Sequence, residues 1–406
     1  MSGALQSSSA TVKPRQLTLN DHLDSLARFA RAHDPRGPAT ALFCIVLALM
    51  GIGLAVQASH ASTIMAPEEF HGQLASQMWF RAGGLIALIL FSRIGPSGVR
   101  RYIPALCVVM TILLIAALLP GIGGAINGSR RWLNLGFFKF QPSELARIVV
   151  VLWAAHKCVT LGPLVSDFKR GVLPMLAVGM WFFVLVAVEP DFGGSLLLFV
   201  CLLATMWVGG ARLNHVSAFL GSVGTVALVL GWFFVPHVHR RIEMFLGHRT
   251  SDQVTGAVQA MTNGGLFGTG VANGDARNLG VPYLESDFAF AQVGEEFGWL
   301  GVLLVIGLLL AFMWQSLRLV YSIRDRYEAI ATFGLLISTV FQALLHIQVV
   351  ADVVPPKGMT LPFISHGGTS LIVACIGVGL AIGAARNSAA DVAPELASGV
   401  PGGVRP

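Results

Sequence analysis

The sequence predicts an all-α fold, a polytopic membrane protein with about ten transmembrane helices, because the chain is strongly apolar and its apolar residues occur in long stretches. Of the 406 residues, 54% are hydrophobic and only 12% are charged, whereas about 25% of the residues in a soluble globular protein are charged. Ten stretches contain few charges and come close to the roughly 17–25 residues that a helix needs to cross the hydrocarbon core.

The ten spans divide the chain into a polar tail (1–38), a membrane domain (39–386) and a second tail (387–406), which is rich in Ala, Gly, Pro and Ser and is predicted to be disordered. In the first tail, Asp21–Arg31 is predicted to be a short amphipathic helix on the inner membrane surface. One long loop covers residues 236–288. The predicted spans are Ala39–Val56, Gln77–Ile94, Ile103–Leu119, Leu145–Val159, Val172–Val188, Gly194–Val208, Val216–Val235, Phe297–Leu317, Ile330–Ile347 and Ser370–Ala385.

Lys and Arg are unevenly distributed between the two sides of the predicted bundle. Most of the 27 lie in the two tails and in the alternate loops that share their side. Since cytoplasmic loops carry an excess of Lys and Arg, this side is predicted to be the cytoplasm, with both termini there. A minority on the outer side, including Arg131, Lys139 and Lys357, raises the question of which anion it meets.

The long outer loop is predicted to be partly structured. Val254, Ala257, Val258 and Met261 have the spacing of one helical face, which could lie at the outer membrane interface. The glycine-rich segment 263–270 follows, and its glycines permit turns with positive φ. A phosphate-binding loop is a weak interpretation of these glycines, because no strand precedes them and the Walker lysine is missing.

Two functional classes are disfavoured. The net charge of +6 would suit nucleic acid, but topology explains the inner charges and no zinc-knuckle, helix-turn-helix or stacking-sheet pattern accompanies them, so no nucleic-acid partner is expected. An inverted-repeat transporter is disfavoured because the two halves do not show paired helices broken by Gly or Pro.

The first polar outer segment carries two cations, Arg131 and Lys139, next to Trp132. Positive charge on an outer loop opposes the orientation bias, and Trp is typical of the headgroup level. Two interpretations stay open for these residues, anchoring to lipid headgroups and binding of an anionic substrate.

Two helix starts are interpreted structurally. Pro142 is typical of a first helical position and Glu144 of a first turn, so Gln141, Ser143 and Glu144 are interpreted as capping residues. Asp191, in a tight outer hairpin, is interpreted in the same way, as the residue that accepts from free backbone donors at the start of the next helix.

Asp287 is the strongest catalytic candidate. It lies where the long loop re-enters the membrane, and an acid near hydrocarbon is costly enough to indicate a function. Helix capping is the alternative, but Ser286 could cap equally well, which favours a functional role for Asp287. Glu295 and Glu296, further along, are interpreted as partners in ion pairs with a neighbouring helix.

The segment 355–370 contains three prolines and three glycines before the last span. Such a segment cannot be a regular helix, and non-helical backbone at membrane depth is tolerated only where it is buried in protein or lines a cavity. The sequence therefore predicts a cavity or a packed re-entrant loop here, with Lys357 at its rim.

Together these segments resemble the SEDS family of shape, elongation, division and sporulation proteins, over about residues 40–386. Within the family, residues 357–362 (KGMTLP) resemble the FtsW division branch more than the RodA elongation branch. The matching motifs are GSRRW at 128–132, QPSE at 141–144, EPDFG at 189–193, NGGLFGTG at 263–270, SDFAFAQVGEEFG at 286–298 and KGMTLPFISHGGTS at 357–370.

The resemblance implies a peptidoglycan glycosyltransferase that polymerises lipid II in septal cell-wall synthesis, in the bacterial inner membrane. It implies as partners a class B penicillin-binding transpeptidase and other membrane proteins of the divisome. The family's catalytic acid maps onto Asp287, and the substrate-binding residues are expected to be Arg131, Lys139, Lys357, Trp132, Glu285, Ser286 and His366.

The chain departs from the family pattern at a few positions near the expected site. Glu285 and Ser286 stand where His and Thr are common, His366 stands where Tyr is common, and Thr369 stands where Ser is common. The change at Glu285 alters the charge next to Asp287.

The implied chemistry fits one acid among several cations. Displacing a lipid diphosphate from an anomeric carbon needs a base for the attacking hydroxyl and cations for the leaving diphosphate, whereas glycoside hydrolysis uses paired carboxylates. A divalent cation, Mg²⁺ or Mn²⁺, bridging the diphosphate is compatible with these residues, although the sequence contains no dedicated all-protein metal cage.

Two alternative functions remain, a lipid II flippase and a non-catalytic divisome scaffold that recruits a transpeptidase. The outer position of the acid and the cations favours an enzyme over a flippase, because carriers place their sites near the bilayer midplane. A scaffold would keep its function when Asp287 is replaced.

Overall fold

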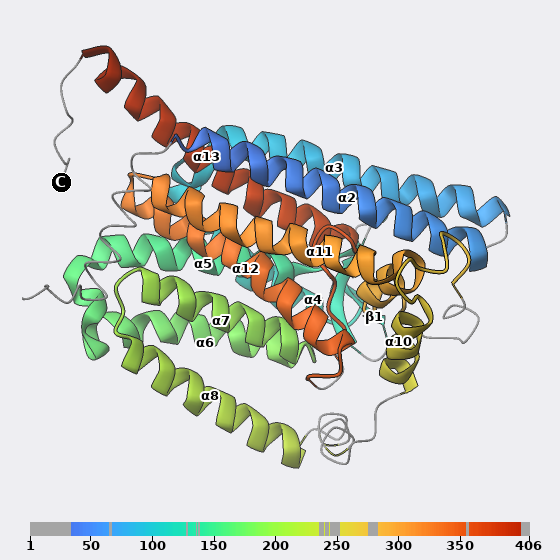
Figure 1. Cartoon of the computed structure of the whole chain (residues 1–406). Coiled ribbons are helices and arrows are strands. Elements are labelled where there is room, and N and C mark those ends of the chain that lie inside the picture. Colours follow the sequence, from blue (N-terminus) through green and yellow to red (C-terminus); the bar gives the residue numbers. More distant parts are fainter. Residues whose placement is uncertain are drawn as a thin grey trace, which may run out of the picture.

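The computed structural model describes residues 34–64, 67–126, 129–134, 136, 139–234, 239, 243, 252–274, 283–354 and 357–398. Each of the ten predicted spans coincides with a helix (Figure 1). Helices form because a segment in lipid must satisfy its own backbone polar groups. They are α2 (Arg36–Ile64), α3 (Pro67–Arg100), α4 (Ile103–Leu118), α5 (Pro142–Leu161), α6 (Leu173–Val188), α7 (Phe192–Val208), α8 (Leu213–Phe234), α11 (Ala289–Ser322), α12 (Arg326–Val350) and α13 (Gly368–Ser398).

The prediction of a polytopic membrane protein is confirmed. Seven of the helices in the described part of the chain are long and apolar enough to cross a membrane, and α4 and α7 are shorter apolar helices. α5, α12 and α13 are the most buried spans, whereas α3 and α11 expose much of their apolar surface at the outside of the bundle. The interior of the bundle is therefore formed mainly by α5, α12 and α13, which also carry buried polar side chains.

The helices run alternately between two ends of the bundle (Figure 1). One is called the basic end here; α2 begins there and α13 ends there. The other is called the cavity end, and it carries a three-stranded antiparallel sheet of β1 (Gly123–Ile126), β2 (Ser129–Asn134) and β3 (Lys139–Phe140). The sheet was not predicted, because strands of two to six residues offer too little alternation to detect.

The second tail differs from its prediction. α13 continues to Ser398, so the segment after residue 386, predicted to be disordered, begins as helix. Its alanines explain this continuation, because Ala has the highest helix propensity. The amphipathic helix predicted at Asp21–Arg31 lies outside the described residues.

In the long loop, the predicted helix is present as α10 (Asp252–Asn263). It packs against α11 with Val254, Ala257 and Ala260 buried. Val258 is 39% exposed, and the buried face follows i, i+3, i+6. α10 therefore uses this face to contact the helix bundle.

The glycine turn after α10 fixes the beginning of α11. Gly265, Gly268 and Gly270 have positive φ, as predicted. Gly298 interrupts α11 at φ 64°, and the amide of the next residue, Trp299, donates to the Gly265 carbonyl at 3.0 Å. The part of α11 before Gly298 is thus a separate helical segment, and the predicted span from Phe297 begins at this break.

Candidate active site

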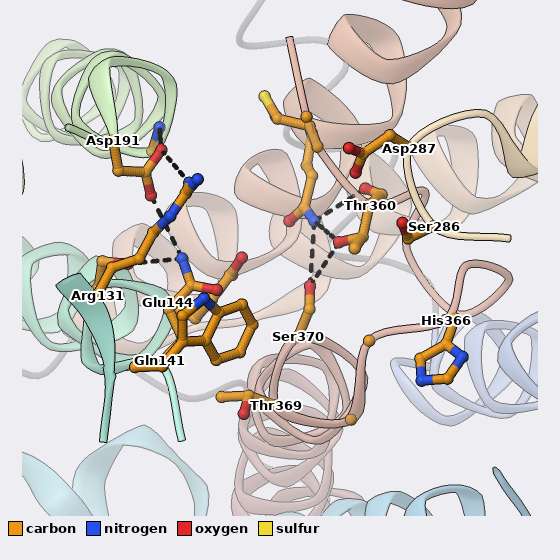
Figure 2. A pocket seen from close by; sticks show the side chains of 18 of the residues that line it. Arg131, Gln141, Glu144, Asp191, Ser286, Asp287, Thr360, His366, Thr369 and Ser370 are labelled. Carbon is orange, nitrogen blue, oxygen red and sulfur yellow. Dashed lines mark hydrogen bonds and ion pairs between the residues drawn. The ribbon is translucent and has the colours of Figure 1, made fainter. Parts of the chain in front are cut away.

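A cavity of about 480 Å³ lies at the cavity end, between the small sheet, the first turns of α5, α7 and α13, and the loops 283–287 and 358–367. Seven of the eight residues expected at the site line it. Figure 2 shows Arg131 and Asp191 on one side, called the cationic wall here, and Asp287 and Ser286 on the other, called the acidic wall. The seven are Arg131, Trp132, Lys139, Glu285, Ser286, Asp287 and His366.

Strand β2 orients the cationic wall. Arg131 and Trp132 line the cavity, whereas Arg130 is exposed and does not. The register between β1 and β2 is irregular here, and Arg131 is the residue of β2 without a partner on β1. Arg131 Nη1 lies 3.7 Å from Asp191 Oδ1. Lys139 is the register partner of Asn134, and its carbonyl accepts from Thr369 Oγ1 at 2.9 Å, which ties the sheet to α13.

Asp191 has a structural role and a site role. As predicted, its side chain caps α7 by accepting from the Gly194 amide at 2.9 Å. It also pairs with Arg131 and accepts from Gln141 Nε2 at 3.3 Å. The sequence indicated only the cap, because the partners come from other loops.

Lys357 does not line the cavity but lies directly behind the cationic wall. A β-carbon at Gly193 would fall 1.0 Å from Cε of Lys357, so the lysine stem occupies the space that this glycine leaves. Lys357 is also close enough to Glu144 to interact with its charge. Because Gly193 has no side chain, the Lys357 stem can pass α7 at this position and bring its charge close to the cationic wall.

A buried carboxyl beside this wall is neutral. Glu189 is fully buried, and neither carboxyl oxygen has a hydrogen-bond partner within the described residues. Burial, with a smaller contribution from the charge of Asp191, raises the pKa of Glu189 to about 9, although Arg131 lowers it. Asp191, and not Glu189, pairs with Arg131.

The acidic wall is held by hydrogen bonds to the backbone before Asp287. Gln57 Nε2 donates to the Glu285 carbonyl at 2.8 Å, and Ser365 Oγ donates to the Ser286 carbonyl at 2.7 Å. These bonds join the segment that carries Asp287 to α2 and to the loop before α13. The segment that carries Asp287 is therefore positioned by contacts with α2 and with the loop before α13.

Asp287 lies one position before the N-cap residue of α11. That N-cap residue is Phe288, whose side chain makes no cap hydrogen bond. Gly358 lies against the acid, since a β-carbon there would fall 2.7 Å from Asp287 Oδ2. The half-buried carboxyl of Asp287 lines the cavity, as a functional role requires, and the capping alternative stays open.

His366 is held as a neutral donor. Arg81 Nη1 donates to Gln77 Oε1 at 2.9 Å, which fixes the amide so that Gln77 Nε2 donates to His366 Nδ1 at 3.0 Å. The ring proton then resides on Nε2. Burial lowers the pKa of His366, the charge of Glu285 raises it, and Arg81 lowers it. His366 therefore presents an N–H group, where the family's Tyr would present an O–H group.

Glu285, the departure beside Asp287, also has a partner. His60 Nε2 lies 3.2 Å from Glu285 Oε2, and His60 is buried in α2. A protonated His60 would balance the charge that Glu285 adds to the acidic wall.

A buried polar network at the base of the cavity was missed. Arg147 Nη2 lies 3.0 Å from Glu144 Oε2 and donates to Gln342 Oε1 at 2.8 Å. Gln342 Nε2 donates in turn to Thr360 Oγ1 at 3.0 Å and to Ser370 Oγ at 3.2 Å. Ionisable residues within apolar spans indicate function, and this signal was available at Arg147.

The interpretation of this helix start is confirmed for Pro142 and Glu144, which both lie in the first turn of α5. Gln141 is the N-cap residue, but its side chain makes no cap hydrogen bond. Gln141, Ser143 and Glu144 line the cavity instead. The side-chain cap predicted for Gln141 is absent. Its amide donates to Asp191 at the start of α7 instead, a contact that a local pattern does not reveal.

Glu295 and Glu296 are buried in the first segment of α11. Glu296 Oε1 accepts from Ser59 Oγ at 2.7 Å and from Gln292 Nε2 at 2.9 Å. The bond from Ser59 connects α11 to α2, whereas the bond from Gln292 lies within α11. The ion pairs expected for the two acids stay a prediction.

The described residues contain no cluster of three or more His, Cys, Asp or Glu side chains placed to hold a metal ion. Mg²⁺ often needs only one or two carboxylates together with substrate phosphates. Asp287 and Glu285 line the cavity and fit that requirement.

This polytopic helical bundle, with a polar and charged cavity at one end, defines an integral membrane protein whose site lies near one membrane face. The chain belongs to the FtsW/RodA/SpoVE family of cell cycle proteins, whose family model matches residues 39–390. The SEDS resemblance seen in the motifs is therefore confirmed.

Relatives with curated names cover nearly the whole family region. The probable peptidoglycan glycosyltransferase FtsW of Nitrosococcus halophilus is 34% identical over 84% of this chain and 91% of that protein. The FtsW of Trichlorobacter lovleyi is 30% identical over 84% of this chain and 91% of its own length. Stage V sporulation protein E of Bacillus subtilis is 30% identical over 86% of this chain and 98% of that protein.

Solved structures share the fold. A chain from a peptidoglycan synthase complex, studied for the coordination of polymerization and crosslinking, has a TM-score of 0.70 at 24% identity, covering 86% of this chain and 97% of that chain. The rod shape determining protein RodA of Thermus thermophilus has a TM-score of 0.63 at 22% identity, covering 85% and 96%.

Proposed function

We propose that this chain is a peptidoglycan glycosyltransferase that polymerises lipid II into glycan strands during septal wall synthesis. The carrying observation is the cavity with an acid, Asp287, on one wall and the cations Arg131 and Lys139 lining it as well. Relatives named as probable peptidoglycan glycosyltransferases support the activity.

In the proposed reaction, Asp287 accepts the proton of a sugar hydroxyl on the acceptor. The hydroxyl oxygen forms a bond to the anomeric carbon of the donor, and the bond from that carbon to the diphosphate oxygen breaks. The electron pair leaves with the lipid diphosphate, so no general acid is needed for departure. A base in this role contributes about 10²–10⁴-fold to the rate.

The cations would stabilise the charge that develops on the diphosphate. Arg131 and Lys139 line the cavity, and Lys357 reaches it from behind Gly193. Fixed cations in a site shielded from water need no reorganisation during the reaction. A divalent cation held by Asp287 or Glu285 would neutralise part of the same charge.

The position of the cavity favours an enzyme over the flippase alternative. Its walls are helix ends, loops and a small sheet at one end of the bundle, whereas carriers bind near the bilayer midplane. The scaffold alternative gives no reason for an ordered acid and cations in one cavity. The likeness to a chain of a peptidoglycan synthase complex supports a class B penicillin-binding transpeptidase as partner, with other divisome membrane proteins.

A direct assay tests this function. Purified protein, with and without its transpeptidase, is incubated with lipid II, and the glycan products are sized on a gel. Polymer that appears only with intact protein supports the proposal. Absence of polymer in both samples, with lipid II moving between vesicle leaflets, would favour the flippase.

The bundle is proposed to have its basic end in the cytoplasm and its cavity outside, in the bacterial inner membrane. Reporters fused at the N-terminus and at residue 390 should read as cytoplasmic. A reporter near Arg249, which lies outside the described residues, should read as external. Opposite signals would reverse the orientation.

The donor role of His366 predicts which replacements keep activity. His366→Tyr restores a hydrogen-bond donor and should keep the rate at limiting lipid II within about threefold, whereas His366→Phe should lower it by up to about tenfold, the net effect of one hydrogen bond.

Gln77→Glu tests the same arrangement without changing a cavity residue. A carboxylate would accept from Arg81 and also from His366 Nδ1, which moves the ring proton and raises the pKa of His366. The pH profile of the polymerisation rate should therefore shift in Gln77→Glu. The double variant Gln77→Glu, His366→Tyr should not show this shift. An unchanged profile in both variants would mean that His366 takes no part in the reaction.

A further inference from the structure

A second cavity lies at the basic end, enclosed by α2, α3 and α13, which run side by side (Figure 1). Its volume is about 440 Å³. Apolar side chains form most of its walls, and three arginines line it as well. The apolar walls include Phe43, Leu88 and Ile382, and the arginines are Arg36, Arg93 and Arg386.

The three arginines lack a carboxylate partner. No Asp or Glu lines this cavity, and none of the three guanidinium groups makes an ion pair in the part of the chain that the structure describes. Their one recorded side-chain contact is a hydrogen bond from Arg386 Nη2 to the Arg93 carbonyl. All three arginines are exposed side chains at the end of the bundle that is predicted to be cytoplasmic, so an anionic lipid headgroup can reach them.

A glycine contact brings two of these arginines together. Gly95, two residues after Arg93, has a non-helical backbone conformation with φ 65°. It therefore interrupts α3 at this point. A β-carbon at Gly383 of α13 would fall 2.6 Å from Cα of Gly95, so the two helices touch at their backbones. The interruption of α3 at Gly95 and its close contact with α13 bring Arg93 and Arg386 together. The backbone of the two helices therefore fixes the position of this cation pair.

The cavity continues into an apolar surface that faces outward from the bundle. On α3, Ile89 lines the cavity and is 49% exposed, and Ile86, one turn towards the cavity end, is 66% exposed. On α2, Leu47 lies one turn beyond Phe43 and is 39% exposed. A ligand that fits both features has an anionic head for the arginines and an apolar chain for this surface.

We propose that this cavity binds an anionic phospholipid, with its phosphate among Arg36, Arg93 and Arg386 and an acyl chain along Ile89 and Leu47. Basic pockets between transmembrane helices on the cytoplasmic side suit such headgroups. The site lies at the opposite end from the proposed active site, so it does not depend on the polymerase function.

Native mass spectrometry of the full-length protein in detergent tests the site. Phosphatidylglycerol and phosphatidylcholine are titrated in equal amounts, and the lipid-bound fraction is measured. Phosphatidylglycerol should be retained preferentially. Each Arg→Gln replacement should weaken its retention about fivefold, and the triple variant Arg36→Gln, Arg93→Gln, Arg386→Gln by on the order of 10²-fold.

A matched control is the triple variant Arg170→Gln, Arg212→Gln, Arg318→Gln, which removes three exposed arginines at the same end but outside the cavity. It should retain phosphatidylglycerol like the wild type. Equal loss in both triple variants, or equal retention of the two lipids by the wild type, would overturn the proposal. Displacement of the lipid by millimolar inorganic phosphate would show a simple anion site instead and would also overturn it.

Discussion

Asp287→Asn is expected to leave the protein folded and inserted while lowering lipid II polymerisation by roughly 10²–10⁴-fold. Asparagine keeps the size and most hydrogen bonds of the side chain but cannot accept a proton at neutral pH. The segment around Asp287 is held through backbone carbonyls by Gln57 and Ser365, and the substitution leaves these bonds in place. The measurement is the initial rate of glycan formation, normalised to folded protein.

Asp352→Asn is the matched control, because it makes the same chemical change in a loop at the same end that does not line the cavity. Asp352 has a φ of 56°, a conformation that Asn tolerates well. Its rate should match that of the wild type. Near wild-type polymerisation by Asp287→Asn would make Asp287 structural, and the base would then be sought at Glu285, Asp191 or Glu295.

Arg131→Gln is expected to lower the rate by roughly 10²-fold, the loss associated with removing one preorganised group that stabilises developing negative charge. Arg130→Gln, one position earlier on β2, should change the rate less than twofold, because Arg130 is exposed and does not line the cavity. The two variants remove the same charge from the same strand. Equal rates in both would assign Arg131 to headgroup anchoring.

Lys139 and Lys357 can be tested in the same assay. Replacement of each by Gln should weaken lipid II use at limiting substrate. Gly193→Ala offers an independent disturbance, since the added methyl group would take the place of the Lys357 stem. It should therefore lower the rate in the same direction as Lys357→Gln. Normal polymerisation by all three cation variants would contradict a role in diphosphate binding.

The helices and the place of Asp287 at the cavity could be predicted because their signals are local. A run of apolar residues of sufficient length predicts a span, and the break at Gly298 coincides with the predicted start of a span at Phe297. Asp287 was identified because it is an acid at the point where a polar loop re-enters the membrane, a feature that is visible in the sequence alone.

The base of the cavity could not be predicted from local signals. Arg147 and Gln342 are 195 positions apart, and only the packing of α5 against α12 brings them together. Glu144 is a first-turn acid, as predicted, but its pairing with Arg147 and its place in the cavity were not visible in the sequence. A sequence shows that a polar group is buried in a span, but the partner depends on how the helices are arranged.

The separation of the acid and the cations onto different walls gives the proposed reaction a direction. The donor's diphosphate belongs beside Arg131, and the acceptor's hydroxyl belongs beside Asp287. After each transfer, the lengthened strand is linked to the diphosphate of the acceptor, which lies at the acidic wall. To act as donor in the next transfer, this diphosphate must lie at the cationic wall. Repeated synthesis at this site therefore requires a translocation step, in which the spent lipid leaves and the strand crosses the cavity before another precursor can enter.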